Sequence, residues 1–165
     1  MNAYAESTSE GWVLVVVRDL PHPPATVWAA LTEPDQLEAW APFTAGRDLG
    51  TPGEATLSMI DGVDGERVDL PVTVLRADAP TLLEYSWGSD RLRWELAATD
   101  SGTRLTLRHR VGSRDDLARA AAGWYLCVDV LEHLLVGDPV PPVRGQDALE
   151  HGWTELHDRY AVRLG

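Results

Sequence analysis

The stretch SRDDLARAAAGWYLCVDVLEHLLVG, residues 113–137, predicts a long amphipathic helix. Ser113 is suited to cap the N-terminus of this helix, and Gly137 followed by Pro139 is suited to end it. We therefore expect a long helix over residues 114–137, which needs a large apolar surface to lie on. Its apolar face is formed by Leu117, Ala120, Ala121, Trp124, Cys127, Val128, Leu131, Leu134 and Leu135.

The residues before this helix supply that surface as strands separated by turns. Trp12–Leu20 is rich in β-branched residues and predicts a strand, which two short helices follow at Ala25–Leu31 and Pro34–Trp40. From Phe43 to Val111, segments such as Arg91–Ala98 alternate apolar and polar side chains. We expect an α+β fold in which a curved antiparallel sheet of about six or seven strands wraps on the long helix.

The two ends of the chain differ in character. Residues 1–10 are polar and acidic, and we expect a disordered N-terminal tail. Residues 147–164 predict an additional last helix that packs on the outer flank of the long helix, at Leu126 and Val130. The link between the two helices is too short to separate domains, so we expect residues 11–165 to form one domain.

Charge and composition limit the possible partners. The 165 residues include 14 basic residues, all of them arginine, and 26 acidic ones, for a formal charge of −12. Nucleic acids and anionic membranes attract positive fields, so we expect neither as a partner. No signal peptide and no apolar run of about 20 residues is visible. A lone Cys127 also fits a reducing compartment, and we expect a cytoplasmic protein.

A sheet that curls around one helix leaves space where the two diverge, which predicts an internal cavity. The chain contains seven tryptophans, and clustered aromatic side chains favour a small apolar or aromatic ligand in that cavity, although they can equally fill the core. The residues that we expect to contact the ligand are Arg18, Trp28, Trp40, Met59, Tyr85, Trp87, Trp94, His109, Trp124 and Val128.

Three of the inward or apolar-face positions carry reactive side chains. His109 continues the inward alternation of its strand and is the candidate either to orient a ligand or to transfer a proton near neutral pH, and a structural role near the strand end is the alternative. Arg18 can meet a ligand carboxylate, and pairing with an acidic side chain at the rim of the sheet is the alternative. Cys127 is expected to act as a small apolar side chain rather than as a nucleophile.

No motif for a cofactor or a metal is present. The histidines of the last helix, His151 and His157, lack the HExxH spacing and predict a solvated polar face. The sequence also contains no GxGxxG, phosphate-binding loop, GxSxG or CxxC motif. We therefore expect no metal and no cofactor.

Several blocks of sequence resemble a known superfamily. Residues 12–40, WVLVVVRDLPHPPATVWAALTEPDQLEAW, resemble the opening of the START-like (SRPBCC) helix-grip superfamily, the fold of the birch-pollen allergen. Residues 82–96, 102–111 and 121–135 resemble the branch named after the activator of the heat-shock-protein-90 ATPase. Residues 153–165 are similar to bacterial members. The resemblance implies a cavity that holds lipids, polyketides, hormones or other apolar molecules.

Three functions stay open at this point. The first is binding of a small apolar molecule between the sheet and the long helix. The second is an enzyme that uses the same cavity for cyclisation, hydration or isomerisation, with His109 as its acid–base group. The third is an interaction module that acts on a chaperone or another protein partner, with a homodimer also possible.

Overall fold

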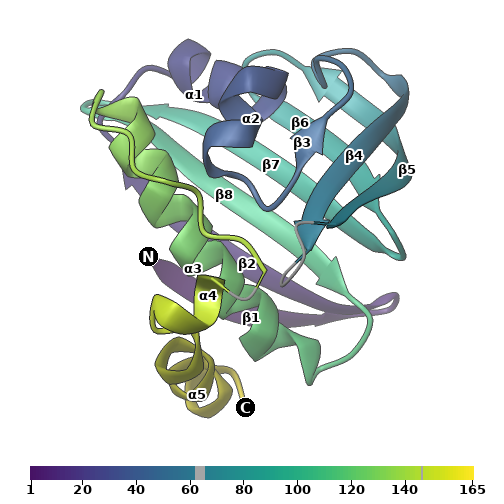
Figure 1. Ribbon diagram of the computed structural model, residues 1–165, viewed down its shortest axis with the longest axis vertical. Helices are drawn as coiled ribbons and strands as arrows, with labels where there is room; N and C mark the ends of the chain where they lie inside the picture. Colours follow the sequence, from purple (N-terminus) through teal and green to yellow (C-terminus); the bar gives the residue numbers. More distant parts are fainter. Residues whose placement is uncertain (62–65, 146) are drawn as a thin grey trace.

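The computed structural model describes residues 1–61, 66–145 and 147–165, and it has the predicted helix-grip architecture (Figure 1). One antiparallel sheet of eight strands, in the order β1-β2-β8-β7-β6-β5-β4-β3, curves around a long helix. The strands are β1 (Asn2–Thr8), β2 (Gly11–Leu20), β3 (Thr44–Ala45), β4 (Gly53–Asp61), β5 (Glu66–Asp78), β6 (Leu82–Trp87), β7 (Asp90–Thr99) and β8 (Gly102–Val111). The helices are α1 (Pro24–Thr32), α2 (Pro34–Trp40), α3 (Asp116–Leu135), α4 (Asp147–Glu150) and α5 (Trp153–Leu164).

Helix α3 is the predicted long helix, two residues shorter at each end than expected. Ser113 does not cap it as predicted. Instead, the backbone N–H and the hydroxyl of Ser113 both donate to the carboxylate of Asp116, at 3.1 and 2.9 Å. At the other end, Gly137 adopts the predicted left-handed conformation, with φ at 81°. Leu117 and Leu131 on the inner face are completely buried, so the sheet packs on this face of the helix.

The N-terminal residues are not a disordered tail, as we expected, but form the edge strand β1. This strand pairs with β2 along its full length, with Ala3 opposite Val16, and Ala3 is buried. Glu6 forms an ion pair with Arg108 of β8, across the intervening strand. These residues carry little apolar signal, because the strand is held by backbone pairing and by charges that are distant in the sequence.

The two short helices after β2 are confirmed. Each begins with a proline in its first turn, Pro24 in α1 and Pro34 in α2, where the missing N–H costs nothing. Trp40 at the end of α2 is buried, and its indole N–H donates to the carbonyl of Ala30 at 2.8 Å. This bond fixes α2 against α1, and α2 in turn packs against α3.

The last helix is interrupted. Instead of one helix over residues 147–164, a short α4 is followed by α5, and Gly152 between them has a φ of 84°. A left-handed residue cannot continue a right-handed helix, so the chain changes direction there. Helix α5 packs against α3 as predicted, with Leu156 and Tyr160 buried. Among the described residues, no helix combines the length and apolar character that crossing a bilayer requires.

The middle of the space between sheet and helices is filled by aromatic side chains. Trp40 and Trp94 meet edge to face, with ring centroids 5.9 Å apart. The indole N–H of Trp94 donates to the hydroxyl of Tyr85 at 3.1 Å, and burial raises the pKa of this tyrosine. These aromatic side chains therefore pack against one another as part of the core.

Candidate functional site

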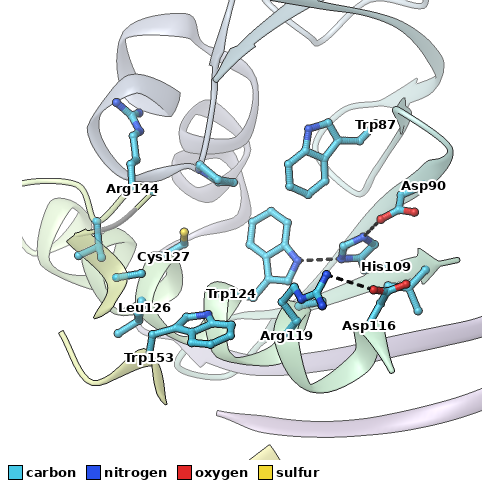
Figure 2. A pocket seen from close by; sticks show the side chains of 17 residues that line it. Trp87, Asp90, His109, Asp116, Arg119, Trp124, Leu126, Cys127, Arg144 and Trp153 are labelled. Carbon is cyan, nitrogen blue, oxygen red and sulfur yellow. Dashed lines mark hydrogen bonds and ion pairs between the residues drawn. The ribbon is translucent and has the colours of Figure 1, made fainter. Parts of the chain in front are cut away.

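A pocket of about 360 Å³ lies beside the N-terminal half of α3 (Figure 2). It is enclosed by α3, by the turn between β6 and β7, and by the segment that leads from α3 to α5. Its volume falls within the range of about 300–1,000 Å³ that is typical of small-molecule sites. The lining residues are Pro42, Trp87, Asp90, His109, Val111, Asp116, Arg119, Ala120, Gly123, Trp124, Leu126, Cys127, Val143, Arg144, Gly145, Ala148 and Trp153.

Three tryptophans form walls of this pocket. Trp124 of α3 lies between Trp87 and Trp153 in the view of Figure 2. The ring centroids of Trp87 and Trp124 are 6.0 Å apart with the planes tilted by 58°, and Trp124 also meets the core residue Trp94 edge to face. The pocket is therefore an extension of the aromatic core whose far side is left unfilled.

Gly123 leaves open space at its position in the wall of the pocket. Apart from the helix itself, no described atom lies within 4 Å of the position that a Cβ on Gly123 would occupy. A glycine in a helix interior costs about 1 kcal/mol relative to alanine. No close contact explains the glycine here, and its effect is to keep the wall of the pocket clear.

A chain of hydrogen bonds connects the strands to the helix at this pocket. Gly88 has a φ of 61°, which suits the tight turn that places Trp87 opposite Asp90. Nε2 of His109 lies 2.7 Å from a carboxylate oxygen of Asp90, and the indole N–H of Trp124 donates to Nδ1 of His109 at 3.0 Å. These two bonds tie the inner face of β8 to the start of β7 and to α3.

The bonds also define the tautomer of His109. An indole N–H is a donor only, so Nδ1 must present its lone pair and the proton of the neutral ring sits on Nε2, from which it is donated to Asp90. The side chain is 4% exposed and points inward, as predicted. Because both ring nitrogens are occupied, His109 can exchange a proton with a ligand only after one of these bonds breaks.

The remaining charged groups are held at the margins of the pocket. Arg119 pairs with Asp116 at 3.5 Å and its side chain is 69% exposed. Arg144 donates to the carbonyls of Ala41 and Glu38 at the end of α2, at 3.0 and 2.6 Å, and burial lowers its pKa. Arg144 therefore attaches the segment after α3 to α2, which is favourable because the C-terminal end of a helix is negative.

Cys127 is an apolar part of the wall. It is buried, and burial raises the pKa of its thiol to about 12. A thiol with this pKa is not a thiolate near neutral pH and is not a nucleophile. The structure thus agrees with the prediction that Cys127 serves as a small hydrophobic side chain.

Three of the ten residues expected to contact a ligand line this pocket: Trp87, His109 and Trp124. Arg18 does not, because its guanidinium forms a two-pronged ion pair with Glu132 of α3, with Nε 2.8 Å from Oε1. That pair is the acidic-side-chain alternative considered above. The other residues that do not line the pocket are Trp28, Trp40, Met59, Tyr85, Trp94 and Val128. Of these, Trp40, Tyr85, Trp94 and Val128 are buried.

Several residues of the pocket could not be predicted from the sequence. Asp90 directly precedes the alternating segment Arg91–Ala98, and nothing in the sequence connects it with His109. Gly123 carried a signal, because a glycine in the middle of an otherwise strong helix pattern needs a reason. Trp153 lies in the predicted last helix, which gives no sign that it reaches a pocket, and Arg144 lies in a proline-rich link without a pattern.

Comparisons with known proteins agree with the fold. The chain superposes on the conserved protein of unknown function EF2215 from Enterococcus faecalis with a TM-score of 0.73 at 16% identity, covering 98% of this chain and 89% of that one. For CalU16 from Micromonospora echinospora the TM-score is 0.69 at 19% identity, with 98% and 94% covered. For the AHSA1 protein from Silicibacter pomeroyi it is 0.65 at 19% identity, with 76% and 99% covered.

These likenesses establish the fold, and the sequence identifies the family. None of the curated proteins matches the chain. The family described as "Activator of Hsp90 ATPase homolog 1-like protein" matches residues 21–136, which is more than half of the chain. The chain therefore belongs to the activator of Hsp90 ATPase homolog 1-like family, within the START-like (SRPBCC) helix-grip superfamily.

Proposed function

We propose that this protein binds a small apolar or aromatic molecule in the pocket beside α3. The observation that carries the proposal is the wall of three tryptophans facing space that Gly123 leaves open. Flat aromatic side chains around a cavity favour ligands with flat apolar surfaces. Burying about 200 Å² of apolar ligand surface would contribute about 5 kcal/mol before the entropic cost of binding is subtracted.

The two alternative functions receive less support. For an enzyme, the candidate acid–base group His109 has both nitrogens engaged within the protein, and Cys127 is a buried thiol. For an interaction module, a contiguous apolar surface is expected. Within the described residues, the exposed large apolar side chains come from β1, β5, α4, α5 and the residue after α3: Tyr4, Val68, Leu75, Val136, Leu149 and Val162.

The experiment fills the pocket without disturbing the core. Gly123→Leu places a side chain into the open space, and Asp129→Leu adds the same side chain to an exposed position of α3 that does not line this pocket. The probe is N-phenyl-1-naphthylamine, a neutral aromatic dye whose fluorescence rises in apolar sites. We measure dye fluorescence and the melting temperature of each protein.

Wild-type protein and Asp129→Leu should bind the dye, and Gly123→Leu should not. At a ligand concentration of 100 times Kd, binding adds about 2.7 kcal/mol to the free energy of unfolding. For a chain of this size that corresponds to a rise in melting temperature of roughly 5–10 °C. Equal binding by Gly123→Leu and the wild type would show that the dye binds elsewhere and would overturn the proposal, as would no binding by the wild type.

A further inference from the structure

We propose that the pocket selects molecules in which an aromatic or apolar body carries a positively charged nitrogen, and that Asp90 binds this nitrogen. The inference rests on the proposed function, since it specifies the class of ligand for the same pocket. It follows from the charge of the Asp90–His109–Trp124 chain and from the positions of the other charged groups around it.

The carboxylate of Asp90 keeps its negative charge beside His109. Because Trp124 donates to Nδ1, the ring of His109 is neutral and donates its one N–H to Asp90. A neutral donor stabilises the carboxylate without cancelling its charge. The side chain of Asp90 is 27% exposed, so a negative charge faces the pocket beside two tryptophans.

The two arginines that line the pocket have partners other than Asp90. Within the described part of the chain, Asp90 lies within ion-pair distance of no arginine. Arg119 is paired with Asp116, and the guanidinium of Arg144 points away from the tryptophans toward the carbonyls at the end of α2 (Figure 2). Asp116 and Arg119 compensate each other, which leaves Asp90 as the carboxylate of the lining without an arginine partner among the described residues. The whole chain carries −12, so this carboxylate and the overall charge both favour a cation.

The tryptophan walls of the pocket also favour a cation. The faces of tryptophan rings attract cations through their negative quadrupole, most strongly where water is excluded. Trp87 and Trp124 line the same pocket as the carboxylate of Asp90. An ammonium group next to an aromatic ring system can thus contact Asp90 while its apolar part lies on the indoles. A carboxylate ligand would instead face the charge of Asp90.

The test uses three ligands that share one ring system and differ in charge. They are 1-naphthylmethylamine (a cation at neutral pH), 1-naphthylmethanol (neutral) and 1-naphthoate (an anion). Binding is measured by titration calorimetry and by quenching of tryptophan fluorescence, at low and at high salt. We expect the amine to bind about tenfold more tightly than the alcohol and the acid to bind most weakly, with the advantage of the amine shrinking as salt rises.

Asp90→Asn removes the charge but keeps an oxygen that can accept the N–H of His109. This variant should reduce the affinity for the amine to that for the alcohol and leave the alcohol unchanged. The matched control is Asp100→Asn, an exposed position in the turn between β7 and β8 that does not line the pocket, which should change neither. If Asp90→Asn does not fold, the charge series in the wild-type protein decides by itself.

The possible failures are distinguishable. Equal affinity for all three ligands, or an unchanged preference for the amine in Asp90→Asn, would overturn the selection of cations by Asp90 but leave the binding pocket intact. Tightest binding of the acid would overturn it too and would indicate Arg119 or Arg144 as the contact. No binding of any ligand by the wild type, together with no binding of the neutral dye, would overturn the proposed function itself.

Discussion

Replacing Trp124 by phenylalanine tests the hydrogen-bond chain that connects α3 to the sheet. The change keeps an aromatic ring but removes the N–H that donates to His109 Nδ1. His109 is 4% exposed, so water cannot readily replace the lost donor. A buried acceptor without a partner costs about 1–3 kcal/mol, and the smaller ring adds roughly 1 kcal/mol through lost packing. We expect urea denaturation to show a loss of about 2–4 kcal/mol in the free energy of unfolding.

A double-mutant cycle separates the hydrogen bond from the packing. His109→Phe alone leaves the N–H of Trp124 unpaired, whereas the double variant leaves neither group unpaired, since Asp90 can turn to water. The double variant should therefore lose about 1–3 kcal/mol less than the sum of the two single variants. Additivity to within about 0.5 kcal/mol would refute the reasoning. Nitrogen NMR on wild-type His109 offers a second check, because a proton on Nδ1 would contradict the assigned tautomer.

Two further predictions concern a pair of glycines, Gly102 and Gly123, and the buried thiol of Cys127. Gly102→Ala should destabilise the protein by at least about 3 kcal/mol in thermal or urea unfolding, because the φ of Gly102 is 153° and a Cβ would lie 2.1 Å from the carbonyl oxygen of Leu20. Gly123→Ala should be neutral or stabilising, because its Cβ meets open space. Similar losses of stability for both variants would contradict this account. Cys127 should react with a thiol reagent far more slowly in native protein than in urea, because burial raises the pKa of its thiol to about 12, and rapid labelling of native protein at neutral pH would refute the assignment. The stability gained by burying the neutral thiol is complete below the pKa of the unfolded thiol and is lost as the pH rises toward the pKa of the folded thiol. Cys127→Ala should therefore lose less stability at alkaline pH than the wild type.

The parts of the fold that sequence reasoning could predict are those that depend on local periodicity. The long helix and the two proline-started helices are specified by neighbouring residues, so their positions followed from the chain alone. Strand β1 was missed because its residues carry little apolar signal: the strand is held by backbone pairing with β2 and by the ion pair between Glu6 and Arg108, two residues that lie far apart in the sequence. Gly152 was overlooked as a break because a glycine inside a helical pattern is often tolerated.

The candidate site shows the same division between local and distant information. Strand alternation correctly gave the inward direction of Trp87 and His109. It gave the same direction for Tyr85 and Trp94, which fill the core instead. Alternation shows which face of a sheet a side chain occupies, but not where along that face space remains. That space depends on how large the side chains of the opposing helix are.

The position of the pocket follows from three small residues on α3. Ala120, Gly123 and Cys127 follow a helical spacing of three and four, and all three line the pocket. Farther along the inner face, Leu131 is large and completely buried, and it does not line this pocket. Side-chain volume along the inner face of a helix can thus decide where a pocket opens, even when the helix is amphipathic along its whole length. Enlarging any of the three small residues should narrow the pocket, whereas reducing Leu131 should create a new cavity and lower stability.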